Sequence, residues 1–271
     1  MLAQRLITAA LGIPLIAGVI LLGGPLYDIV LAAILAVAAF EFCAIVSPRD
    51  GPPRPFWKPT LWQLLAVAGV ILVVVRADRV DDEIGVVSGI IALWLVFTMI
   101  RNRPLSYRRF AWMGALVAVV YIGVLGAHFV PLRDLDGDGK WVFLAILGTW
   151  ATDTFAYGTG RLIGRRKIAP RISPGKTLEG TAAGLAGGLV SVIVIAEVLD
   201  LPMSIGEAAL LGALLPATAV VGDLVESHIK RGAGVKDTSE LVPGHGGFLD
   251  RLDSLLFTVP LVYYFAIWVV L

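Results

Sequence analysis

Long apolar runs, separated by short polar connectors, follow one another along almost the whole chain. Each run approaches the roughly 20 residues that a helix needs to cross a bilayer. The runs are residues 5–23, 26–46, 61–75, 84–100, 111–131, 141–158, 179–199, 207–225 and 253–271. They lack the alternation of apolar and polar residues that marks membrane strands, and helices satisfy their own backbone hydrogen bonds in lipid. The pattern predicts an all-α integral membrane protein with about nine transmembrane helices.

Basic residues in the connectors predict how these helices are oriented. If the N-terminus is cytoplasmic, all but four of the 22 Lys and Arg residues fall on the cytoplasmic side. The four outside are Arg76, Arg79, Arg133 and Lys140. Cytoplasmic loops of membrane proteins carry an excess of Lys and Arg of this kind. We therefore expect a cytoplasmic N-terminus.

Composition supports the membrane assignment and excludes several functions. Charged residues make up 16% of the chain, against roughly 25% in a soluble domain, and 58% of residues are hydrophobic. The formal net charge of +1 gives no reason to expect a nucleic-acid partner. A single cysteine, Cys43, excludes an intrachain disulfide framework and a zinc cluster built on cysteines.

The two halves of the chain differ in where they carry polar residues. Residues 1–131 have few charges inside the apolar runs, with Glu41 as the main exception, and we predict that they form a scaffold of transmembrane helices. No internal repeat relates this half to the other, which argues against an inverted-repeat transporter. Residues 132–271 form the predicted catalytic region, with cytoplasmic loops at 159–178 and 226–252.

Carboxylates inside or beside apolar runs are the first candidates for chemistry. Asp153 lies within one run and Asp223 near the cytoplasmic end of another. Ionised groups at bilayer depth are unfavourable, so they usually serve a function. Asp223 shares a helix face with Ser227, as does Asp250 with Asp253 if that segment is helical. A helix cap or an ion pair is the structural alternative for each, but their clustering toward one side of the membrane favours a functional site.

Two short motifs resemble known binding loops and are rejected. Residues 175–177 read Gly-Lys-Thr, like the end of a P-loop, but Pro170 stands where the first glycine is required and no strand is predicted before it. The acidic loop 134–139 resembles the start of an EF-hand, but Ala145 stands where a bidentate Glu is needed. In the first case a basic loop attracted to anionic lipid is the alternative, but it does not explain why Ser173-Pro174 stiffens the approach to Lys176 and Glu179. In the second case we expect a solvated turn.

The segment 226–252 combines cations, glycines and carboxylates. Glycines let backbone N–H groups approach an anion, and the cations add charge. Carboxylates beside them would repel a bare phosphate, unless a divalent metal joins the two. His245, between glycines, is either a structural hydrogen-bonding residue or a phosphate ligand. The candidates here and at the start of the next span are Ser227, Lys230, Arg231, Lys236, His245, Gly246, Gly247, Asp250, Arg251 and Asp253.

At these residues the chain resembles the CTP-dependent phosphatidate cytidylyltransferases, also called CDP-diacylglycerol synthases. The family's signature is matched from Ser227 to Asp253, with Val242 at a position where the family usually carries Leu, Ile or Phe. The run around Asp153 and the block 173–180 are similar as well. The resemblance covers roughly residues 150–253, whereas the N-terminal half matches only in its hydrophobic character.

The resemblance implies a magnesium-dependent enzyme of phospholipid biosynthesis that transfers the cytidylyl group of CTP to phosphatidate. Its site is expected at the cytoplasmic face of the cell (inner) membrane. We assign Asp223 and Asp250 as metal ligands, with Asp253 in support; with Lys236 they form the predicted catalytic set. The predicted substrate-binding residues are Asp153, Lys176, Ser227, Lys230, Arg231, His245, Gly246, Gly247 and Arg251. Asp153 is a candidate for ordering the lipid headgroup pocket or for holding a second cation. The family pattern suggests a homodimer.

Two other functions remain open from the sequence. Polyprenol and phytol kinases are related membrane enzymes that use CTP, but they need a base for an alcohol and should lack the complete 227–253 signature. An ion-coupled transporter would carry ionisable groups along a route to the outer side. In this chain those groups gather toward one face.

Overall fold

The computed structural model describes residues 2–46, 59–77, 90, 94, 97, 111–242, 244 and 246–271. The predicted span 84–100, apart from three isolated residues, and His245 lie outside this description. The chain forms two compact units. Unit 1 comprises Met1–Pro131 and Ile229–Leu252, and unit 2 comprises Leu132–His228 and Asp253–Leu271.

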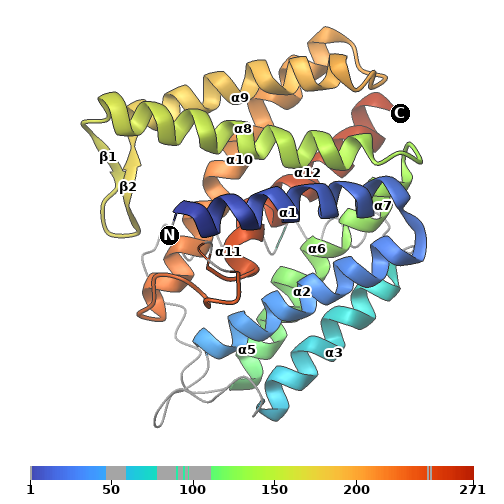
Figure 1. Cartoon of the computed structure of the whole chain (residues 1–271), viewed down its shortest axis with the longest axis vertical. Helices are drawn as coiled ribbons and strands as arrows, with labels where there is room; N and C mark the ends of the chain where they lie inside the picture. Colours follow the sequence, from blue (N-terminus) through green and yellow to red (C-terminus); the bar gives the residue numbers. More distant parts are fainter. Residues whose placement is uncertain are drawn as a thin grey trace. The chain divides into compact units, whose positions relative to one another are not determined.

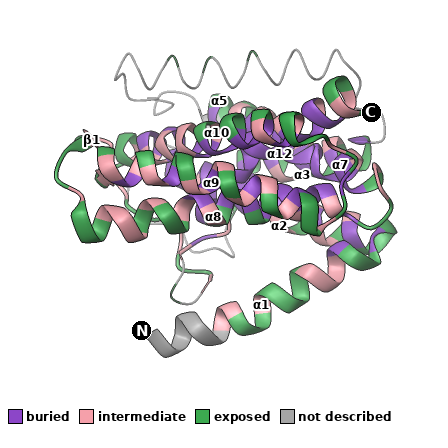
Figure 2. Ribbon diagram, turned by 90° about the horizontal axis from the view of Figure 1, so that it is seen from above, coloured by how far each residue is buried: buried purple, intermediate pink, exposed green. Residues whose placement is uncertain are grey.

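Unit 1 is built around α2, Gly24–Val46. The other helices are α1 (Leu2–Leu22), α3 (Leu61–Val75), α5 (Ala111–Ala118), the π-helix η3 (Val119–Val124), α6 (Leu125–Ala127), α7 (Phe129–Asp134, which continues into unit 2) and α11 (Leu249–Leu252). Helices α3, α5 and α11 pack against α2. Phe42 of α2 meets Tyr121 edge to face in the core, with ring centroids 6.0 Å apart. Helix α1 also contacts α2 but is exposed along much of its described length (Figure 2).

Unit 2 is built around a helix pair that runs side by side, α8 (Lys140–Ile163) and α9 (Leu178–Val198) (Figure 1). Glycines four residues apart on α9, Gly180, Gly184 and Gly188, are buried. A Cβ at Gly184 would lie 2.9 Å from the Cβ of Ala156 on α8. Because membrane helices gain little from apolar burial against one another, small residues that allow close backbone approach drive such pairs. Most of α10 (Ile205–Gly232), α12 (Leu255–Phe265) and the π-helix η4 (Ala266–Val270) complete the unit.

A small hairpin that the sequence pattern did not indicate joins α8 to α9. Strand β1 (Lys167–Ala169) pairs antiparallel with β2 (Ser173–Thr177). The expectation that no strand precedes the Gly-Lys-Thr motif was therefore wrong, because β1 precedes it and the motif is the end of β2. The strands are too short to show a period in the sequence. The rejection of a P-loop now rests on Pro170.

Helix α10 extends further than the sequence pattern indicated. We predicted a span at 207–225 followed by a loop, but the helix continues to Gly232 and Gly234 follows in a left-handed conformation, with φ of 76°. Polar residues do not end a helix by themselves, whereas glycine with positive φ commonly does. Ser227, Lys230 and Arg231 are therefore helical residues.

Five described helical stretches are long and apolar enough to cross a membrane: Gly24–Val46, Trp112–Asp134, Leu178–Val198, Ile205–Gly232 and Leu249–Val270. Shorter apolar helices lie at Thr8–Leu22 and Leu61–Val75. Helix α8 has 24 residues, but polar side chains such as Asp153 interrupt its apolar character. The protein is therefore a predominantly helical, multi-pass membrane protein.

Candidate functional site

In unit 1 a buried ion pair joins the end of α10 to α11. Lys230 Nζ lies 2.7 Å from Asp250 Oδ1, and the two side chains are 12% and 4% exposed. Asp250 Oδ2 accepts hydrogen bonds from the backbone N–H of Thr238 (2.9 Å), the Thr238 hydroxyl (2.9 Å) and the backbone N–H of Gly247 (2.8 Å). Both carboxylate oxygens therefore have donors. Asp250 thus organises the signature loop, which we define as residues 233–248 between α10 and α11.

Two glycines of the signature loop lie too close to carboxylates to carry a side chain. Gly246 has φ of 84°, and a Cβ there would lie 2.7 Å from Asp250 Oδ2. A Cβ at Gly247 would lie 2.5 Å from Glu41 Oε2 and would collide with the Thr238 hydroxyl. Positive φ and close approach both favour glycine. These glycines are thus required by the loop itself, whatever they contribute to phosphate binding.

Glu41 of α2 is the residue of this region that the site prediction did not include. It is 2% exposed, and its carboxylate accepts hydrogen bonds from the signature loop and from the first residue of α11. The sequence carried a signal, because Glu41 is a charged residue within an apolar run. It did not reveal the partner, since the loop lies about 200 residues further along the chain.

In unit 2 a second carboxylate, Asp223 of α10, pairs with Lys176 of β2. Lys176 Nζ lies 2.6 Å from Asp223 Oδ2, and the side chains are 19% and 27% exposed. Ser227, one helical turn after Asp223, donates its hydroxyl hydrogen to Asp223 Oδ1 at 3.1 Å. This cluster therefore offers a cation, a carboxylate and a hydroxyl that are partly open to solvent.

The hairpin and the first turn of α9 hold Lys176 in place. Thr177 is the N-cap of α9, where its side chain accepts an N–H of the first turn. Glu179 accepts the backbone N–H groups of Arg165 and Arg166 at 2.9 Å and 3.2 Å. The block 173–180 is thus a strand followed by a capped helix, and its acidic residue ties down the start of the basic segment.

The other predicted residues lie wholly or partly at the surface. Lys236, Arg231 and Arg251 are exposed, and Asp153 and Asp253 are half-buried. Helix α11 ends at Leu252 and a turn follows. Asp250 therefore lies in α11, whereas Asp253 lies in the turn before α12.

The donor sets differ in how well they suit a divalent cation. Among the described residues no three His, Cys, Asp or Glu side chains come together as a ligand group. Magnesium usually binds through only one or two carboxylates, with substrate phosphates and water. Asp223 fits this use, since it is partly exposed and shares its oxygens with one lysine and one hydroxyl. Asp250 has four donors, so a cation there would have to replace Lys230 at Oδ1.

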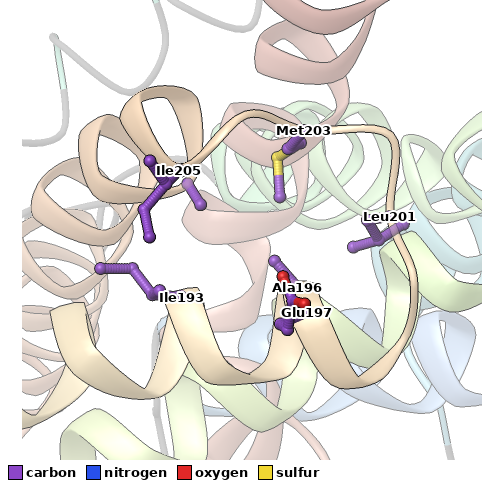
Figure 3. Close-up of a pocket in the computed structure, with 7 residues that line it drawn as sticks. Ile193, Ala196, Glu197, Leu201, Met203 and Ile205 are labelled. Atoms are coloured by element: carbon purple, nitrogen blue, oxygen red, sulfur yellow. The ribbon is translucent and has the colours of Figure 1, made fainter.

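A small cavity in unit 2 does not fit a nucleotide. It lies between the end of α9 and the start of α10, and Figure 3 shows the side chains around it. Its lining is apolar apart from Glu197, and none of the lining residues is basic. A triphosphate needs cations or a metal, so the polar clusters of the two units are the better candidates.

Comparisons of the sequence with known proteins point to one family. The sequence model of the cytidylyltransferase family matches residues 3–269. A phosphatidate cytidylyltransferase of Bacillus subtilis (strain 168) is 32% identical over 264 residues, which cover 96% of both chains. One from Synechocystis is 32% identical over 97% of this chain and 96% of the relative. The chloroplastic phosphatidate cytidylyltransferase 5 of Arabidopsis thaliana is 30% identical over 97% and 71%. The chain therefore belongs to the cytidylyltransferase family.

Proposed function

We propose that this membrane enzyme transfers the cytidylyl group of CTP to phosphatidate and releases pyrophosphate, giving CDP-diacylglycerol for phospholipid biosynthesis. The observation that carries the proposal is the family match along residues 3–269, together with relatives of that name that align over nearly the whole chain. The signature from Ser227 to Asp253 adds support, because it is a combination of cations, glycines and carboxylates suited to phosphates.

The reaction is a displacement at phosphorus. A phosphate oxygen of phosphatidate forms a bond to the α-phosphorus of CTP, and the bond from that phosphorus to the departing pyrophosphate breaks. With a second phosphate pKa near 6, phosphatidate carries nearly two negative charges at neutral pH. The attacking oxygen is already ionised, so no strong general base is needed. Catalysis rests on in-line positioning and on neutralisation of phosphate charge.

The cations of both units are the groups that we assign to the phosphates. Lys176, Arg231 and Lys236 are the proposed phosphate clamps, with Lys230 and Arg251 in support. Lys176 and Lys230 are held by carboxylates in this structure, whereas Lys236 is exposed. Ser227, Asp153, His245, Gly246 and Gly247 complete the proposed substrate-binding set.

We further propose that magnesium is held by Asp223 and Asp250, with Asp253 in support, and that Asp153 orders the lipid headgroup or holds a second cation. When bound, magnesium would neutralise phosphate oxygens and stabilise the charge of the departing pyrophosphate. The partly exposed oxygens of Asp223 support this assignment more directly than those of Asp250.

The setting that we propose is the cell (inner) membrane, with nine spans, a cytoplasmic N-terminus and the site facing the cytoplasm. The excess of Lys and Arg in alternate connectors supports this orientation. CTP is water-soluble and phosphatidate is a lipid, so the reaction requires the interface on the nucleotide's side. We also propose a homodimer, as the family pattern suggests.

The deciding experiment uses purified protein in detergent with phosphatidate and labelled CTP. Lipid-linked cytidine and pyrophosphate, formed only with divalent metal, are the expected products. CDP together with a phosphorylated alcohol would instead identify a lipid kinase. Full activity in excess chelator would contradict the magnesium proposal and leave the family assignment intact.

A further inference from the structure

Glu41 is a buried acidic residue that the proposed chemistry does not use. It lies in the second half of α2, in the N-terminal part of the chain that the sequence marked only as scaffold. Four donors lie within hydrogen-bond distance of its carboxylate, and one of them, the Thr238 hydroxyl, is shared with Asp250. Oε1 accepts from the Ser239 hydroxyl at 2.6 Å and the Phe248 N–H at 3.1 Å. Oε2 accepts from the Leu249 N–H at 2.9 Å and the Thr238 hydroxyl at 3.2 Å.

These donors come from both ends of one segment. Thr238 and Ser239 lie in the first half of the signature loop, whereas Phe248 and Leu249 lie where the loop enters α11. One carboxylate therefore closes the loop on itself and ties it to α2. A buried carboxylate with several donors holds the loop firmly, because a hydrogen bond to a charged group is stronger than one between neutral groups.

The Thr238 side chain links Glu41 to Asp250. Its hydroxyl oxygen lies 2.9 Å from Asp250 Oδ2 and 3.2 Å from Glu41 Oε2, and it has one hydrogen to donate. A Cβ at Gly247 would also meet Glu41. A displacement of Glu41 would thus shift the backbone around Asp250 and Gly247.

We propose that Glu41 is a positioning residue for cytidylyl transfer. It holds the signature loop in the form in which Asp250, Gly246 and Gly247 meet the nucleotide, so α2 takes part in the reaction through the loop. The inference rests on the proposed function for its kinetic consequence. The anchoring itself is measured without any turnover.

The test is Glu41→Gln in the full-length protein. Glutamine keeps the shape but replaces one acceptor oxygen with an NH2 donor, which faces two of the four donors. We expect backbone amides of 238–249 to exchange hydrogen about tenfold faster than in wild type. In the variant only a fraction of the molecules should hold the signature loop in the form that binds CTP. The KM for CTP should therefore rise about tenfold, and kcat at saturating CTP should change little.

Two further variants separate positioning from general stability. Gln63→Ala removes the capping box that Gln63 forms with Thr60 at the start of α3, also in unit 1. It should lower the melting temperature without changing loop exchange or the KM for CTP. Ser239→Ala removes one of the four bonds, so its effect should be smaller than that of Glu41→Gln and the double variant should be less than additive.

If the amides of 238–249 exchange at the wild-type rate in Glu41→Gln, Glu41 does not hold the signature loop. If they exchange faster but the KM for CTP is unchanged, Glu41 holds the loop without affecting the reaction. An equal rise in KM in Gln63→Ala would also count against the positioning role. Wild-type protein that does not convert CTP and phosphatidate would overturn the proposed function instead, while the exchange measurement would still decide the anchor.

Discussion

At the scale of single residues, the two candidate metal carboxylates have unlike surroundings. Asp223 is 27% exposed and meets Lys176 and Ser227, whereas Asp250 is 4% exposed and meets four donors. From the sequence alone, replacement of Asp250 by Asn should hardly affect folding. The structure changes that expectation, because a buried carboxylate that orders a loop and neutralises a half-buried lysine also contributes to stability.

Asp223→Asn should lower turnover with little effect on stability. If Asp223 holds a metal that neutralises phosphate charge, its loss should cost several kcal/mol of transition-state stabilisation, which is roughly a hundredfold or more in kcat. The melting temperature in detergent should stay near wild type, since the side chain is partly exposed. Asp134→Asn, at an exposed position of the acidic segment 134–139, is the matched control and should keep full activity. Turnover of Asp223→Asn within a few-fold of wild type would exclude it as a metal ligand.

Asp250→Asn should lower both turnover and stability. Asparagine cannot neutralise Lys230, and its NH2 group would face one set of donors, so we expect a loss on the order of 3 kcal/mol. Thermal unfolding in detergent, compared with Asp223→Asn, measures the difference. Equal melting temperatures for the two variants would contradict the organising role of Asp250.

At the scale of elements, close approach of α8 and α9 helps to place the hairpin that carries Lys176 in unit 2. The glycines of α9 allow that approach, and Thr177 and Glu179 then fix the hairpin at its end. The apolar run predicted a helix here, but it did not identify which face carries the contact. The contact face also depends on α8 residues such as Ala156, which lie in a separate part of the sequence.

Gly184→Ala should destabilise the protein, although alanine favours helices by about 1 kcal/mol over glycine. The added Cβ would lie 2.9 Å from the Cβ of Ala156, so the helices must move apart, at a cost of about 1–3 kcal/mol. Gly158→Ala on α8 is the same change at a position where a Cβ meets nothing within 4 Å. It should be neutral or stabilising. The comparison is made by melting temperature, and the same shift in both variants would refute the packing argument.

At the scale of the whole molecule, the number and orientation of the spans decide which face carries the hairpin and the signature loop. In a Cys43→Ala background, Ile168→Cys and Val235→Cys should react with impermeant reagents only from the cytoplasmic side. Asp138→Cys, in the acidic loop, should react only from outside. Labelling of position 168 or 235 from outside would contradict the nine-span topology and separate these segments from cytoplasmic CTP.

Local patterns in the sequence determined most of the helices and the chemical class. The run at 61–75 coincides with α3, and the signature at 227–253 identified the family, because apolar length and motif spacing are properties of neighbouring residues. The hairpin between α8 and α9 escaped notice because strands of three and five residues have no readable period.

Only the tertiary structure decided what each polar residue contacts. Glu41 was visible as a charge in an apolar run, but its partners lie about 200 positions away, at Thr238, Ser239 and the start of α11. Lys176 and Asp223 likewise come from a strand and a helix with α9 between them in the chain. Hydrogen bonds and ion pairs depend on how close two groups lie in space, and the periodicity of the sequence does not indicate that distance.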